Sequence, residues 1–113
     1  VAHGMGSDPG NTGWAKRFSN RPGSNASSTG CFTTGDTYYG KNGHSRRLLG
    51  LDPENSNALE RAIVIHGADY VDTGMAEREG RIGRSWGCFA VQERQIEEVL
   101  ARLGPGRLLF AAQ

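Results

Sequence analysis

The chain has 113 residues with 13 basic and 12 acidic side chains, so its formal net charge is +1. This length fits one domain with a modest core. The near-neutral net charge disfavours a protein that binds nucleic acid through its phosphate groups. No run of 18 apolar residues occurs, so the sequence predicts no membrane span.

The first half of the chain predicts turns and a β-hairpin. Glycine is frequent, with 17 residues spread between apolar runs, which is typical of a mostly β domain with many tight turns. We expect little regular structure over 1–30, apart from a short strand at Val1-Ala2. Threonine and aromatic residues favour a strand over 31–39, and 44–51 would return after a glycine-rich turn. A short helical piece is expected over 57–61.

The second half predicts a buried strand and a C-terminal helix. Residues 62–65 are apolar and β-branched, which indicates a central strand that ends at His66. A short helix over 73–79 would stop at Gly80. Apolar residues recur at helical spacing over 92–103, which predicts the main helix. A last apolar strand is expected over 108–111, and the whole chain, 1–113, is expected to form a single domain.

The two cysteines, Cys31 and Cys88, allow two interpretations. They form one disulfide, as in an oxidising compartment, or one of them is a reactive thiol with a histidine partner. Cys88 directly follows Gly87, which permits a sharp turn in which the N–H groups of both residues face an oxyanion. His66, held at a strand end, is placed to activate the thiol. The simpler alternative is a buried, inert cysteine and a hydrogen-bonded histidine.

His66-Gly67 followed by Ser85-Trp86-Gly87-Cys88 resembles the signature of the L,D-transpeptidase (YkuD-like) family. Further pieces, in order along the chain, are closest to its YkuD_2 branch, the murein L,D-transpeptidase catalytic domain. They include Val1-Ala2-His3-Gly4, Gly6-Ser7-Asp8, Phe18-Ser19-Asn20, Thr34-Gly35-Asp36-Thr37-Tyr38, Arg61-Ala62-Ile63-Val64 and His66-Gly67-Ala68-Asp69-Tyr70-Val71. The resemblance covers nearly the whole chain.

The resemblance implies a mostly β, sandwich- or barrel-like domain with one C-terminal helix and short helical turns. It implies an exported bacterial enzyme of the periplasm or cell envelope that acts on peptidoglycan stem peptides. Cys88 would form a thioester at an L-centre, and an amine of a second stem would resolve it. His66 would move the protons, oriented by the Gly67 carbonyl, and the Gly87 and Cys88 N–H groups would form the oxyanion hole. A carbapenem would acylate Cys88.

The chain departs from the family pattern at several positions. Trp86 replaces a histidine that is usual in the wider family, and Ala90 stands where an arginine or asparagine is common, so we expect Arg84 or Arg81 to hold the substrate carboxylate. The chain begins where the family's domain has already started, so we expect its first hairpin to be missing. The residues expected to contact substrate are Ser85, Arg84, Trp86, Tyr38 and His3.

Several alternatives stay open at this point. Three histidines with Cys88 suggest zinc, but no pair has the short spacing of a zinc site, so we expect neither metal nor cofactor. Water in place of the amine would make the protein an L,D-carboxypeptidase or stem-peptide hydrolase. A Cys31–Cys88 disulfide would instead indicate a non-catalytic peptidoglycan-binding module.

Overall fold

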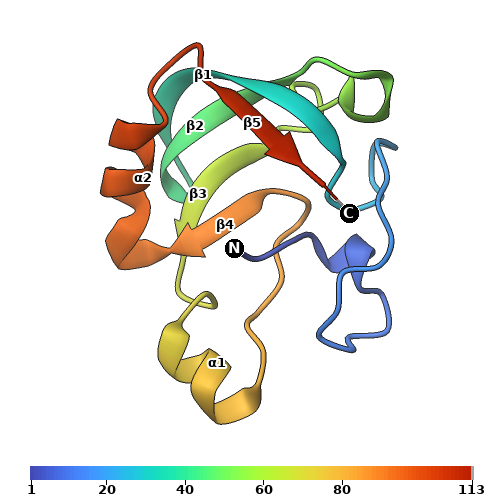
Figure 1. Ribbon diagram of the computed structural model, residues 1–113, viewed down its shortest axis with the longest axis vertical. Helices are drawn as coiled ribbons and strands as arrows, with labels where there is room; N and C mark the ends of the chain where they lie inside the picture. Colours follow the sequence, from blue (N-terminus) through green and yellow to red (C-terminus); the bar gives the residue numbers. More distant parts are fainter. Residues whose placement is uncertain (113) are drawn as a thin grey trace.

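The computed structural model describes residues 1–112 as a mostly β structure built on a five-stranded mixed sheet (Figure 1). This confirms the predicted fold class. The strands and helices are β1 (Gly30–Gly40), β2 (Gly43–Gly50), β3 (Val64–Ala68), α1 (Thr73–Glu79), β4 (Phe89–Gln92), α2 (Ile96–Arg102) and β5 (Leu108–Ala111).

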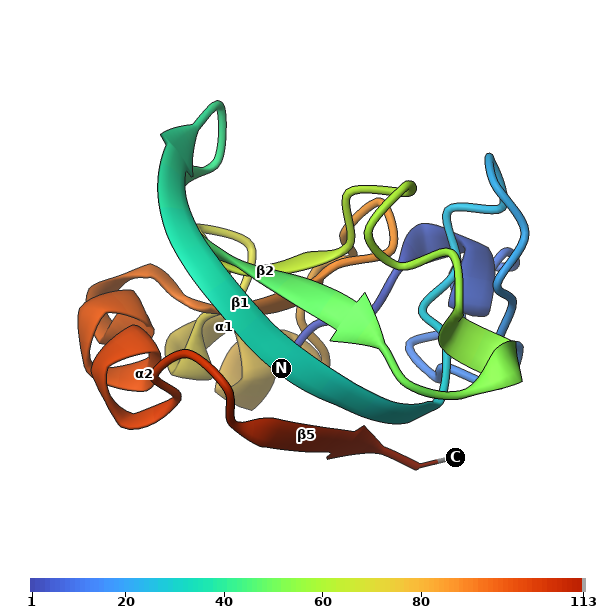
Figure 2. The same cartoon turned by 90° about the horizontal axis from the view of Figure 1, so that it is seen from above.

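The sheet has the strand order β4-β3-β2-β1-β5. β3 and β4 are parallel, and the other neighbouring pairs are antiparallel. β1 and β2 form the predicted hairpin, in which Gly43 takes the turn with a φ of 83°. A bulge between Thr34 and Thr37 disturbs the β1–β2 register, and Figure 2 shows β1 curving strongly along its length.

β3 lies between β2 and β4, and its side chains are buried. The predicted strand over 62–65 was right in kind but wrong in its bounds. Ala62 has a φ of 56° and donates its N–H to the Leu59 carbonyl at 3.1 Å, so it closes a turn and cannot extend the strand. As a result His66 lies inside the strand and not at its end.

Two clusters of apolar side chains form the core. The larger one lies between the sheet and α2, and its buried members are Phe32, Leu48, Ala58, Ile63, Ile65, Phe89, Ile96 and Leu100. The smaller one joins the start of the chain to β3 and β4, and its buried members are Ala2, Ala68, Val71 and Ala90. β3 and β4 contribute to both clusters, because successive side chains of a strand point to opposite faces.

The predicted helices differ in accuracy. α1 has the predicted bounds, and Gly80 ends it in the left-handed conformation with a φ of 72°. The predicted helix over 92–103 starts later, at Ile96, because Gln92 belongs to β4 and 93–95 form a 3-10 turn. The helical piece predicted over 57–61 is wrong: those residues form hydrogen-bonded turns, and the 3-10 turn of this region lies at Pro53–Asn55.

The first thirty residues carry little regular structure, as predicted. The strand predicted at Val1-Ala2 is reduced to an isolated bridge between Ala2 and Ala90, and a second bridge joins Gly4 to Ser85. Figure 1 shows the N-terminal segment passing beside β4 and the loop that precedes it. This contact matters for the cysteine loop, which we define as residues 85–88.

Candidate active site

The cysteine loop presents Cys88 directly before β4. Gly87 has a φ of 123°, and a Cβ atom at this position would lie 2.9 Å from Ile63 Cδ1, so glycine is required. The Ser85 side chain is 1% exposed and closes the loop. Its hydroxyl donates to the Cys88 carbonyl at 2.6 Å and accepts from the Gly87 N–H at 3.2 Å. These contacts hold the backbone around Cys88 in a defined orientation.

Residues distant in the sequence brace this loop. The Ser85 N–H donates to the His3 carbonyl at 2.8 Å, and the Met5 N–H donates to the Ser85 carbonyl at 2.7 Å. The buried Ser27 hydroxyl donates to the Gly87 carbonyl at 3.2 Å. Ser27 was not singled out in the sequence, because a lone serine in a turn-rich segment carries no local signal of this contact.

The Cys88 thiol rests against the backbone at the start of β3. Its Sγ donates to the Ala62 carbonyl at 3.4 Å and accepts from the Val64 N–H at 3.5 Å. Burial raises the pKa of the thiol above its ordinary value, while the Val64 N–H and the positive charges of Arg61 and Lys41 oppose the rise. In this resting position burial therefore favours the protonated form of the Cys88 thiol.

β3 holds His66, which is 4% exposed, in a fixed tautomer. Its Nδ1 lies 2.9 Å from the Gly67 carbonyl oxygen. A carbonyl can only accept, so Nδ1 carries a proton, and in the neutral ring Nε2 keeps a lone pair. Within residues 1–112 no hydrogen bond engages Nε2, so this nitrogen is available as a base.

The sheet register brings His66 and Cys88 into one neighbourhood. His66 pairs with Ala90, and Cys88 stands two residues before Ala90. With strands about 4.8 Å apart and a rise of about 3.3 Å per residue, the Cα atoms of His66 and Cys88 are about 8 Å apart. In the described part of the chain no hydrogen bond joins the two side chains, because the thiol points to the backbone of 62–64.

The two N–H groups predicted to form the oxyanion hole differ in their hydrogen bonding. The Gly87 N–H is bonded to the Ser85 hydroxyl. The Cys88 N–H makes no hydrogen bond within residues 1–112. Of the two groups predicted to bind an oxyanion, one is free and one is held by a bond of 3.2 Å.

The two cysteines are not joined. Cys31 and Cys88 are both free thiols. Cys31 lies on β1, which two strands separate from β4. Three strand spacings of about 4.8 Å exceed the largest Cα separation that a disulfide can bridge, about 7 Å. The predicted alternative of a Cys31–Cys88 disulfide is therefore not formed in this structure.

Arg61 lies beside the cysteine loop and was not predicted as a site residue. Its guanidinium donates to the Ser19 carbonyl at 2.9 Å and to the Ala26 carbonyl at 2.6 Å, and burial lowers its pKa. Trp86 is 73% exposed, and with Arg61 it lines a shallow cavity of about 510 Å³. The sequence signal for Arg61 was its position just before a buried strand, which does not by itself indicate a function.

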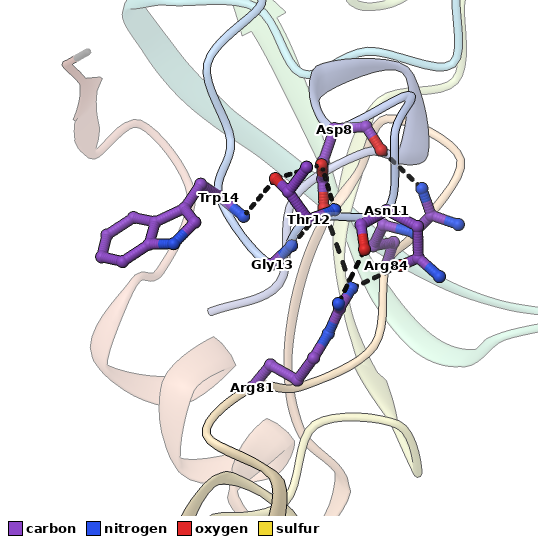
Figure 3. Close-up of polar contacts among 7 residues, drawn as sticks. All are labelled: Asp8, Asn11, Thr12, Gly13, Trp14, Arg81 and Arg84. Atoms are coloured by element: carbon purple, nitrogen blue, oxygen red, sulfur yellow. Dashed lines mark hydrogen bonds and ion pairs between the residues drawn. The ribbon is translucent and has the colours of Figure 1, made fainter.

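The predicted carboxylate-binding arginines contact the N-terminal loop, as Figure 3 shows. Arg84 Nη1 donates to the Asp8 carbonyl at 2.6 Å, and Arg81 Nη1 donates to the Asn11 carbonyl at 2.8 Å. The Asp8 carboxylate accepts the Thr12 N–H at 2.8 Å, and this bond leads those that hold the pKa of Asp8 below its usual range. Both arginines fasten the loop over 8–13, and their contact with substrate stays a prediction.

The other two predicted substrate contacts lie in different places. His3 packs edge-on against Phe89, with ring centroids 6.1 Å apart, and burial lowers its pKa. Phe89 and Ala90 are successive residues of β4, so their side chains point to opposite faces of the sheet. Ala90 is the residue that pairs with His66. His3 is therefore on the face away from His66. Tyr38 lies on β1, with the Arg47 guanidinium 4.2 Å over its ring.

Residues 1–112 offer neither a cluster of metal ligands nor a membrane-spanning helix. No group of three or more histidine, cysteine, aspartate or glutamate side chains in this range is arranged to hold a metal ion. None of the helices in this range is long and apolar enough to cross a membrane.

Comparison with known families identifies the fold. The family model for YkuD_2, the L,D-transpeptidase catalytic domain, matches residues 1–112. The chain belongs to this family. Searches of curated proteins and of solved structures found no match. The resemblance predicted from the sequence is thereby confirmed. The chain is an L,D-transpeptidase-like catalytic domain, and membership of this family implies peptidoglycan as the substrate class.

Proposed function

We propose that this domain is a peptidoglycan L,D-transpeptidase that acts through a thioester on Cys88. The observation that carries the proposal is a free thiol on a braced loop, one strand away from a buried histidine with a fixed tautomer. Cys88 Sγ attacks the carbonyl carbon at an L-centre of the donor stem peptide, and the bond to the following D-amino acid breaks. The amine of a second stem then attacks the thioester, which releases the thiol and joins the stems.

His66 moves the protons in this scheme. Its Nε2 takes the thiol proton, gives it to the departing amine and later takes a proton from the acceptor amine. The Gly67 carbonyl, bonded to Nδ1, keeps Nε2 directed at the reaction. The step requires the Cys88 thiol to leave the Ala62 carbonyl by rotation about χ1. The imidazolium that forms then stabilises the thiolate against the burial that raises its pKa.

The oxyanion of the tetrahedral intermediate would be held by the backbone of the cysteine loop. The Cys88 N–H has no partner in residues 1–112, and the Gly87 N–H has only its bond to Ser85 at 3.2 Å. Backbone donors fixed before the reaction stabilise the developing charge without reorganisation. Ser85 is thus assigned a positioning role: its hydroxyl fixes the loop that carries both donors.

Trp86 is the best-supported substrate contact among the predicted residues. It is exposed, adjacent to Gly87, and lines the cavity of about 510 Å³. An exposed indole two residues before the reacting cysteine offers a flat apolar wall to a peptide or sugar chain. Contact between substrate and Tyr38, Arg84 or His3 stays a prediction. Arg84 donates to the Asp8 carbonyl, and His3 lies on the face away from His66.

Substrates in the cell wall require an exported protein. We therefore propose that this domain works in the bacterial cell envelope or periplasm. The same thioester would also support hydrolysis if water replaced the amine, and product analysis distinguishes the two reactions.

The proposed function is tested by the products formed from a donor tetrapeptide stem and an acceptor stem. Mass spectrometry of the mixture should show a cross-linked product together with a free D-amino acid. The Cys88→Ala variant should form neither. Release of the D-amino acid with a shortened donor and no cross-link would assign carboxypeptidase activity. Product formation by Cys88→Ala would contradict the proposed chemistry.

A further inference from the structure

A second cavity is lined by residues of β1, β2 and the start of β3, including two residues that contact the Cys88 thiol. It has a volume of about 150 Å³. Two of its lining residues, Ala62 and Val64, are the residues whose backbone atoms contact Cys88 Sγ, at 3.4 Å and 3.5 Å. The start of β3 thus contacts the cavity and the thiol alike. The lining residues are Tyr38, Arg47, Leu59, Ala62, Ile63 and Val64.

Arg47 is the one cation among these lining residues, and two contacts orient it. It stands on β2 opposite Val64, with its guanidinium 4.2 Å over the Tyr38 ring. Its Nη1 is 3.1 Å from the Asp36 carboxylate. The two side chains of that ion pair are 39% and 74% exposed, so the pair contributes little and leaves Arg47 free to exchange partners.

The rest of the cavity complements an aliphatic arm that ends in an acid. Leu59 and Ile63 supply apolar wall, and no acidic side chain is among the six lining residues. A guanidinium presents a planar fork of donors that matches a carboxylate. Arg81 and Arg84, by contrast, already donate to backbone carbonyls of the N-terminal loop.

We propose that Arg47 binds a carboxylate of the donor stem peptide in this cavity. The inference rests on the proposed function and deepens it, because it assigns the specificity for an acidic donor to a residue of β2. Tyr38 is the positioning residue: its ring supports the guanidinium. Because the cavity and the thiol share Ala62 and Val64 as neighbours, a carboxylate bound to Arg47 would lie on the side of β3 that leads to the scissile bond.

The test measures binding without turnover, in a Cys88→Ala background. Calorimetry compares a donor tetrapeptide with versions amidated at each carboxylate in turn. Arg47→Met should weaken binding of the acidic peptide about tenfold or more, as for the loss of a charged hydrogen-bonded pair. One amidated peptide should bind the parent protein as weakly as the acidic peptide binds Arg47→Met. Its affinity should not change further on Arg47→Met. Arg47→Lys should restore part of the affinity.

A matched control removes another exposed ion pair. Arg102 pairs with Glu98 at 3.1 Å on α2, so Arg102→Met should leave peptide affinity unchanged. The inference would be overturned if Arg47→Met weakened binding of all peptides equally, or if its affinity for the acidic peptide stayed within twofold of the parent's. The proposed function would still stand in that case if the wild type forms products. If binding depended on Arg47 and one carboxylate but the wild type formed no products, the inference would stand and the proposed function would be contradicted. An absence of binding by every peptide would count against both.

Discussion

Ser85→Ala removes the side chain that closes the cysteine loop. The serine hydroxyl is buried and makes two hydrogen bonds, to the Cys88 carbonyl at 2.6 Å and from the Gly87 N–H at 3.2 Å. Each lost bond costs about 1 kcal/mol, and more where a buried partner is left unsatisfied. We expect the free energy of unfolding to fall by about 2 kcal/mol. For a domain of this size the melting temperature should fall by about 8 °C.

Urea titration and thermal melting measure this loss, and Ser19→Ala is a matched control. Within residues 1–112 the one hydrogen bond of the Ser19 hydroxyl is accepted from the Arg21 N–H at 3.1 Å, in an exposed turn. Its removal should therefore cost less than about 0.5 kcal/mol. Ser85→Ala should also slow acylation of Cys88 about tenfold, since the loop no longer holds its donors in place. Equal stability of the two variants would refute the claim that Ser85 holds the loop.

Three further predictions follow from the same contacts. Gly87→Ala should lose about 2 kcal/mol of stability in urea titration, because alanine is strained at a φ of 123°. In a Cys31→Ala background, Lys41→Met should move the pH inflection of Cys88 alkylation to higher pH, because it removes a charge that lowers the thiol pKa, whereas Lys16→Met should not. The pKa of Asp8 is lowered in the fold, so its stabilisation is present above the ordinary carboxyl pKa and lost as pH falls through the lowered value. Melting temperature measured against pH should therefore drop in acid less steeply for Asp8→Asn than for wild type; a parallel drop would contradict this.

Local signals predicted the elements that local interactions determine. α1 has its predicted bounds because Asp72 caps its start, accepting the Gly74 N–H at 3.2 Å, and Gly80 ends it. The hairpin of β1 and β2 likewise follows from turn residues between β-forming runs. Each of these depends on residues within a few positions along the chain, so a single sequence is sufficient to locate them.

Contacts between distant residues were not predictable in the same way. β4 pairs in parallel with β3 across a long connection, and no periodicity over four residues indicates such a partner. The position of His66 inside β3 depends on the turn that Ala62 closes. The bonds from Ser27 and Arg61 around the cysteine loop span tens of residues, so their roles emerged only from the folded structure.

The candidate site shows the same division. Cys88 and His66 were found from their motifs, and in the structure His66 lies on β3 while Cys88 directly precedes the neighbouring strand β4. The bond from the Arg84 guanidinium to the Asp8 carbonyl was not predictable from the motif, and contact of Arg84 with substrate stays a prediction. Arg47, which lines a cavity next to the thiol, has no motif around it. Its position follows from the β2–β3 register alone.

Acylation of Cys88 can be measured by intact mass after incubation with a carbapenem. We expect one covalent adduct on the wild type and on Cys31→Ala, none on Cys88→Ala, and a strongly slowed reaction on His66→Ala. An adduct that persists on Cys88→Ala, or a wild type with two free thiols that acquires no adduct, would contradict this expectation.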